Sequence, residues 1–95
     1  HRQALTAGAG ETTALTNVFT GRPARGIRNR LMRELGPLRA DVPAFPQAAA
    51  AVTPLRTRAE SEGRGDFSPL WAGQNTSGCR AIPAAQITRE LAEGW

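Results

Sequence analysis

The sequence predicts a mostly α-helical segment with one short strand near residues 12–19, forming a single incomplete domain over residues 1–95. Apolar residues recur every three or four positions in several stretches, which is the spacing of one buried helix face. Only residues 12–19 show the alternation of a strand, and we find no good second strand candidate. Because an isolated strand leaves its backbone groups unpaired, we expect its partners in further sequence.

The chain opens with residues 1–7, which have the composition of a helix end, and Gly8 and Gly10 then supply a cap and a loop. The predicted strand follows and ends before Gly21. The beginning of the first helix is expected to lie before His1, and we expect no signal peptide directly before this residue. These features suit an internal fragment of a longer protein, which we expect to be inactive alone.

An arginine-rich helix is predicted from Pro23, because proline fits the first helical turn, where its missing N–H costs nothing. It is expected to end at Gly36. Its apolar stripe consists of Ile27, Leu31 and Leu35. The arginines largely off that stripe are Arg25, Arg28, Arg30 and Arg33. We interpret them as a solvated face, with a phosphate or acidic-partner surface as the alternative.

Residues 36–46 contain three prolines and are predicted to form an extended loop. A helix follows and should break at Pro54, whose ring clashes with the carbonyl four residues back, so that Thr53 caps a second helix. That helix is expected to end at Gly63. The i, i+4 ion pairs predicted on it are Arg56–Glu60 and Arg58–Glu62.

Residues 66–79 are predicted to be irregular, and the closing helix should run from Pro83 to about Glu93. Ile87 and Leu91, four residues apart, are expected to form its buried face, with Gly94 as the cap.

The composition limits the class of protein. Much of the 40% hydrophobic fraction is alanine, so the core is expected to be thin. Cys79 is the only cysteine, which rules out a disulfide within the chain and fits a reducing compartment such as the cytoplasm. No apolar run approaches the roughly 18 residues of a membrane span. All twelve basic residues are arginine, which we attribute to an arginine-biased genome rather than to nucleic-acid binding.

The most site-like segment is Leu70 to Gln74, LWAGQ. Trp71 offers a flat apolar face, Gly73 permits close backbone approach, and Gln74 brings one acceptor and two donors. This combination suits a flavin edge or a small polar substrate, and the alternative is that Trp71 only anchors a loop on the core. His1 and Cys79 cannot form a zinc site, and no glycine-rich phosphate loop is present.

The order and spacing of four pieces of sequence give the chain a resemblance to a known family. The pieces are TALTNVFTGRPARGIRNRLMREL, PAFPQAAAAVTPLR, GDFSPLWAGQ and PAAQITREL. Together they cover nearly the whole chain and resemble the C-terminal segment of nitronate monooxygenases, formerly called 2-nitropropane dioxygenases. None of the four pieces is a catalytic signature by itself.

The resemblance implies an α/β parent fold, a (β/α)8 barrel that binds FMN, with this chain as its C-terminal fragment. The implied reaction is oxidation of an alkyl nitronate by FMN and dioxygen to a carbonyl compound and nitrite. The phosphate-binding turn and the catalytic histidine are expected before His1. We therefore assign no catalytic residue to this chain. Trp71, Gly73 and Gln74 are the candidate cofactor or substrate contacts.

The chain departs from the family where some members place tyrosines and a lysine near the pocket, around residues 45–53. Phe45 stands at a plausible tyrosine position, and the chain contains neither tyrosine nor lysine. This leaves open related FMN barrels, the NAD(P)H:quinone reductases and the enoyl reductases. An alternative of another class is a small arginine-rich nucleic-acid-binding module, for which no aromatic interleaving is present.

Overall fold

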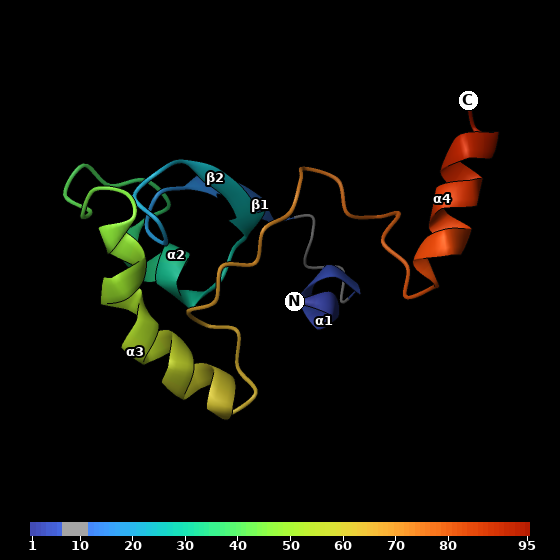
Figure 1. Cartoon of the computed structure of the whole chain (residues 1–95). Coiled ribbons are helices and arrows are strands. Elements are labelled where there is room, and N and C mark those ends of the chain that lie inside the picture. Colours follow the sequence, from blue (N-terminus) through green and yellow to red (C-terminus); the bar gives the residue numbers. More distant parts are fainter. Residues whose placement is uncertain (7–11) are drawn as a thin grey trace.

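The computed structural model describes residues 1–6 and 12–95, and Figure 1 shows their arrangement. The elements, in chain order, are α1 (Arg2–Thr6), β1 (Thr13–Thr16), β2 (Ala24–Ile27), α2 (Arg30–Leu35), α3 (Gln47–Ser61) and α4 (Ala84–Glu93). The loop predicted at Gly8 and Gly10 lies outside the described residues. The predicted strand near 12–19 and the predicted irregular stretch over 66–79 are both confirmed.

The strand β1 has a partner within the chain, which corrects the sequence-based prediction. β1 and β2 form an antiparallel hairpin in which Thr13 faces Ile27 and Thr16 faces Ala24. The helix predicted from Pro23 therefore begins only at Arg30. Two physical reasons favour the strand: Gly26 is unfavourable inside a helix, and Asn29 is a good N-cap that starts α2 later.

The core is as thin as expected and lies where the hairpin meets α2. Its buried residues are Ala14, Val18, Phe19, Leu31 and Met32. The side chains that pack against them are Val42, Val52, Phe67 and Trp71. Of the stripe predicted for the arginine-rich helix, Ile27 and Leu31 are buried but Leu35 is 42% exposed. Leu35 is the last residue of α2, directly before the cap Gly36, so it lies at the exposed end of the helix although it is four positions after the buried Leu31.

The helix α3 runs unbroken through Pro54, so the predicted break and the Thr53 cap are wrong. Thr53 instead donates its hydroxyl to the carbonyl of Ala49, 2.8 Å away, within the same helix. Ala50, whose carbonyl loses its usual donor at Pro54, is exposed, so water can satisfy it. The predicted end at Gly63 is confirmed, because Gly63 has a positive φ of 73°.

The turn between β1 and β2 contacts the proline-rich loop at Gly21. This glycine has a φ of 92°, and a β-carbon built on it would lie 2.6 Å from both the Pro43 carbonyl oxygen and the Phe45 backbone nitrogen. Asn17 binds the other end of the same loop, donating to the Arg39 carbonyl and accepting from its N–H. The loop over 36–46 is thus held against the hairpin.

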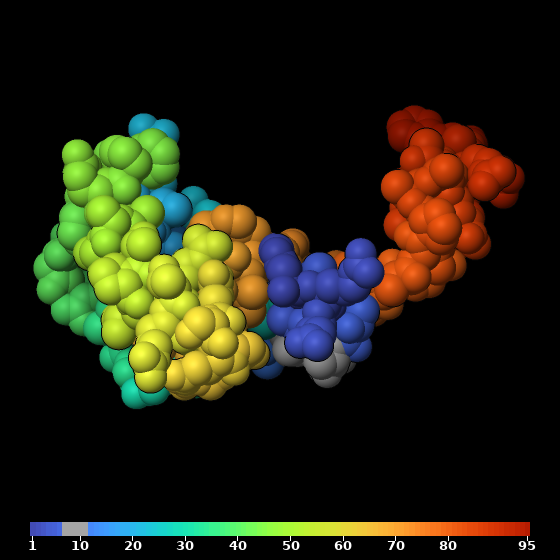
Figure 2. Space-filling view, turned by 60° about the horizontal axis from the view of Figure 1, so that its bottom comes forward, coloured from blue at the N-terminus to red at the C-terminus, as the bar shows by residue number. Residues whose placement is uncertain are grey.

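The helix α4 lies apart from the other elements, beyond an extended segment that follows Trp71 (Figures 1 and 2). It contains no buried residue: Leu91 is 66% exposed and Ile87 is only partly covered. The prediction that these two residues form a buried face is wrong, because periodicity marks the apolar face of a helix without supplying a surface to cover it. Gly94 is the C-cap, as predicted. Across residues 1–6 and 12–95, no helix combines the length and apolarity needed to span a membrane.

Candidate functional site

The segment that carries the candidate site runs beside β2 as an additional backbone partner. The Ile27 N–H donates to the Leu70 carbonyl at 2.8 Å, and the Ala72 N–H donates to the Arg25 carbonyl at 3.2 Å. Gly26 and Trp71 form the antiparallel bridge between these two bonds. The hairpin therefore fixes the backbone of the segment up to Ala72.

Trp71 is half-buried, and its position combines the two roles that the sequence left open. Its ring meets Phe19 edge-to-face, with centroids 5.7 Å apart and planes at 85°, so it is anchored on the core. It also borders a hollow of about 150 Å³. The lining of this hollow is Phe19, Thr20, Ala49, Val52, Thr53, Arg56, Phe67, Pro69 and Trp71.

Gly73 and Gln74 follow Trp71 but do not line the same hollow; both are exposed. A β-carbon on Gly73 would meet nothing within 4 Å, so close approach to this backbone is sterically open. In the part of the chain that the structure describes, the Gln74 amide has no hydrogen-bond partner. Its donors and acceptor are free to contact a group outside this chain. The three predicted site residues are thus neighbours in sequence that share a loop rather than one cavity.

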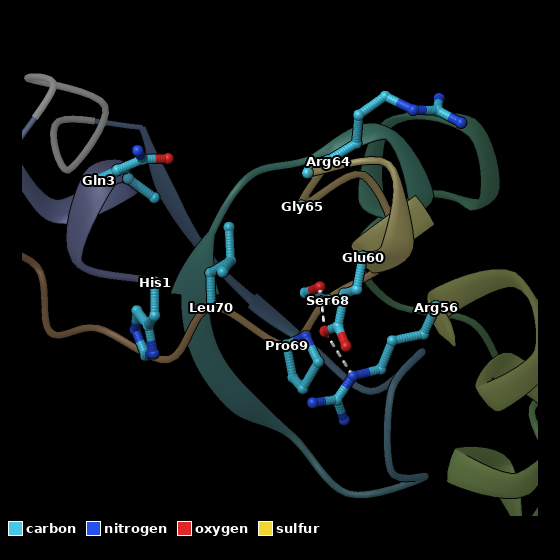
Figure 3. Close-up of a pocket in the computed structure, with 11 residues that line it drawn as sticks. His1, Gln3, Arg56, Glu60, Arg64, Gly65, Ser68, Pro69 and Leu70 are labelled. Carbon is cyan, nitrogen blue, oxygen red and sulfur yellow. Dashed lines mark hydrogen bonds and ion pairs between the residues drawn. The ribbon is translucent and has the colours of Figure 1, made fainter. Parts of the chain in front are cut away.

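A second, larger pocket of about 370 Å³ lies between α1, the end of α3 and the segment over 65–70 (Figure 3). Glu60 accepts hydrogen bonds from Ser68 Oγ at 2.6 Å and from Arg56 Nε at 2.8 Å. These two bonds, the Ser68 bond foremost, hold the pKa of Glu60 below the ordinary glutamate value. On its far side, His1 Nε2 lies 2.8 Å from the Trp71 carbonyl oxygen. Glu60 and Arg56 are therefore paired with each other in this pocket, whereas Arg64 pairs with Glu62 and Asp66 outside it.

Ser68→Ala is expected to raise the pKa of Glu60 toward the ordinary value of 4.5. A carboxyl whose pKa is lowered by folding stabilises the protein above its unfolded pKa, and the benefit is lost as pH falls through the folded pKa. The stability difference between wild type and Ser68→Ala should therefore shrink below about pH 4. Carboxyl titration by NMR measures the shift. Glu90, whose pKa is lowered by Arg80 on another element, should titrate unchanged; an unmoved Glu60 would contradict the assignment.

Both predicted ion pairs are confirmed, and the arginines concerned therefore make contacts within the chain. Arg56–Glu60 and Arg58–Glu62 form at 2.8 and 2.7 Å. In the arginine-rich stretch, Arg30 pairs with Glu34 at 2.7 Å. Cys79 is exposed and unpaired. Among the described residues, no three His, Cys, Asp or Glu side chains gather where they could hold a metal ion.

Two residues that shape the site escaped the sequence analysis, Gly26 and Asn29. Gly26 is buried, and a β-carbon on it would lie 3.0 Å from the Leu70 carbonyl oxygen and 3.3 Å from Trp71 Cε3. Asn29 is 6% exposed and donates its amide to the Gly65 and Ser68 carbonyls at 2.9 and 2.8 Å. A glycine inside a predicted helix, followed three residues later by a good N-cap, was the available signal.

Comparison with known proteins decides the family. The family model described as nitronate monooxygenase matches residues 1–94. The chain belongs to the nitronate monooxygenase family. The resemblance seen in the four sequence pieces is thereby confirmed.

The curated relatives carry the same family name. A nitronate monooxygenase of Pseudomonas aeruginosa is 37% identical over 94 residues, which are 98% of this chain and 27% of the relative. A probable nitronate monooxygenase of Staphylococcus saprophyticus is 31% identical over 75 residues, 79% of this chain and 21% of that protein.

A solved structure extends the comparison to three dimensions. Nitroalkane oxidase from Streptomyces ansochromogenes superposes with a TM-score of 0.82 at 40% identity, over 96% of this chain and 26% of that one. The chain thus spans about a quarter of the length of the proteins it matches most fully.

Proposed function

We propose that this chain is the C-terminal segment of an FMN-dependent (β/α)8-barrel enzyme that oxidises alkyl nitronates with dioxygen to a carbonyl compound and nitrite. The observation that carries the proposal is the family match over residues 1–94, together with the chain's span of about a quarter of its relatives. The longer polypeptide that we propose is called the complete enzyme below. The exposed, unpaired Cys79 supports a reducing compartment such as the cytoplasm.

The residues present fit one side of a flavin and substrate site. The Gln74 amide lacks a partner among the described residues and stands next to an open backbone at Gly73. A polar group in this state is suited to an external acceptor, such as a nitronate oxygen or the polar edge of a flavin ring. No glycine-rich phosphate loop occurs in the sequence, so the phosphate of FMN would be held by other parts of the complete enzyme.

FMN, when bound, supplies the electron transfer to and from dioxygen and substrate. The role of this chain is to bind and orient the nitronate. We assign Gln74 as a hydrogen-bond donor to an anionic nitronate oxygen, a charge-assisted contact. We assign Trp71 as an apolar wall that excludes water from one side of the substrate. Its ring can hold this position because the Phe19 ring packs against it in an edge-to-face arrangement.

Phe45 bears on the choice of substrate. It is 47% exposed, and the Arg22 guanidinium lies 4.3 Å from the centre of its ring. The resemblance to the family implies a tyrosine of some members at this position, and a phenylalanine offers no hydroxyl to a nitronate oxygen. We propose that nitronate recognition in the complete enzyme does not use a hydroxyl at this position.

The 95-residue chain is expected not to bind FMN tightly, whereas the complete enzyme should be isolated yellow, with bound flavin. The physical reason is that the chain lacks a phosphate-binding loop. Equilibrium dialysis of the chain with FMN tests the first statement. Nitrite release from propyl-2-nitronate under air, by the complete enzyme, tests the second. Micromolar flavin binding by the chain would misplace the cofactor site, and reduction of a quinone by NAD(P)H without nitrite formation would favour the related reductases.

A further inference from the structure

We infer that Gly26 and Asn29 are positioning residues that set the orientation of the site loop, Trp71 to Gln74, toward the substrate. The inference rests on the proposed function of that loop. Neither residue reaches the loop's polar end: Gly26 lies in β2 and Asn29 just before α2. Both act on the backbone of the segment that leads into it.

Gly26 allows the site segment to approach β2 more closely than any other residue type would. A β-carbon at this position would lie 3.0 Å from the Leu70 carbonyl oxygen, a backbone atom that cannot rotate away. It would also lie 3.3 Å from Trp71 Cε3. The neighbouring bonds from Ile27 to Leu70 and from Ala72 to Arg25 hold the segment at this distance. An added methyl group must therefore push the segment, and Trp71 with it, outward by a few tenths of an ångström.

Asn29 ties the same segment to α2 through two different functions of one side chain. Its Oδ1 accepts a hydrogen bond from the Met32 N–H at 3.4 Å and so caps α2. Its Nδ2 donates to the Gly65 and Ser68 carbonyls. Because the side chain is 6% exposed, water cannot readily replace these bonds. The Asn29 amide therefore holds residues 65–68, and Gly26 contacts Leu70 and Trp71, which follow them.

The two contacts matter for the site because, apart from the His1 ring at the Trp71 carbonyl, the described residues make no hydrogen bond to the loop beyond Ala72. The last backbone bond before Gln74 is the one from Ala72 to Arg25, next to Gly26. Gly73 and Gln74 are exposed beyond it. The direction in which the Gln74 side chain projects therefore depends on the path of the backbone from Leu70 to Ala72. A small displacement at Gly26 is carried to the Gln74 amide.

A double-mutant cycle in the complete enzyme separates positioning from general stability. Gly26→Ala should lower kcat/KM for propyl-2-nitronate roughly fivefold, because misplacing a binding group by a fraction of an ångström weakens the productive geometry. The loss should appear mainly as a raised KM. In a Gln74→Ala background the same substitution should cost less than about twofold, because the group it misplaces is already gone.

Asn29→Ser provides the second variant, and Gly78→Ala the control. Serine retains an oxygen that can cap α2 but cannot reach both carbonyls, so it should repeat the background-dependent loss. A β-carbon on Gly78 would meet nothing within 4 Å, so Gly78→Ala should leave kcat/KM unchanged in both backgrounds. If Gly26→Ala and Asn29→Ser cost nothing, or cost the same in both backgrounds, the positioning role is refuted. If Gln74→Ala itself leaves kcat/KM unchanged, the site loop is wrongly assigned and the inference falls with it.

Discussion

Gly21→Ala is expected to lower the free energy of unfolding of the complete enzyme by about 2–5 kcal/mol. Two effects combine at this position. An L-residue is strained at a φ of 92°. In addition, its β-carbon would approach the Pro43 oxygen and the Phe45 nitrogen to 2.6 Å, and both are backbone atoms. Relief requires the turn and the proline-rich loop to separate, which also disturbs the Phe45 ring stacked under Arg22.

Gly63→Ala is the matched control, because it isolates backbone strain from steric overlap. Gly63 has a similar positive φ of 73°, but a β-carbon on it meets nothing within 4 Å. Gly63→Ala should therefore lower the free energy of unfolding by only about 1–2 kcal/mol, which is the strain of a left-handed residue alone. Urea denaturation of both variants measures the difference. Equal losses would show that the loop yields freely and that the contact with Gly21 contributes nothing to stability.

The helices that the sequence predicted well are those whose signals are local. The end of α3 near Gly63 and the pairs Arg56–Glu60 and Arg58–Glu62 depend only on residues within one turn of each other. The predicted break at Pro54 is wrong because a proline lowers the stability of a helix without always preventing it. A helix whose freed carbonyl, at Ala50, is exposed to water can accept that cost.

The strand β2 was missed because its backbone partners lie eight or more positions away in the sequence. Taken alone, the stretch after Pro23 has the apolar spacing of a helix through Ile27 and Leu31. Pairing with Thr13–Thr16 on one side, and with Leu70 to Ala72 on the other, supplies its backbone bonds. No local pattern reveals that second partner, since residues 66–79 carry no strand periodicity.

For the site, the sequence indicated which residue types could recognise a ligand but not what holds them. Trp71 was expected either to wall a pocket or to anchor a loop; in the structure its ring does contact the core at Phe19 and also borders a hollow. Gly26 and Asn29 act through backbone atoms, at distances that residue chemistry alone does not predict. The roles of Gly73 and Gln74 stay predictions, which kinetics can test.

Gln74→Ala is expected to lower kcat/KM of the complete enzyme for an alkyl nitronate by about tenfold or more, because a hydrogen bond to a charged group is worth about 1.5–3 kcal/mol. Its melting temperature should stay nearly unchanged, since the Gln74 side chain is exposed and makes no hydrogen bond or ion pair within the described chain that truncation would break. Steady-state nitrite release and thermal unfolding, measured on the same preparation, test both statements.

Gln74→Glu sharpens this test by keeping the shape of the side chain while removing its donors. A carboxylate facing an anionic nitronate adds repulsion to the lost hydrogen bond, so Gln74→Glu should be less active than Gln74→Ala. Gln86→Ala is the control, because Gln86 lies on α4 and bonds to Glu90 of the same helix at 3.0 Å. It should leave kcat/KM at the wild-type value. A glutamate variant as active as wild type, or activity that falls only in step with stability, would make the loop structural and place nitronate recognition elsewhere in the enzyme.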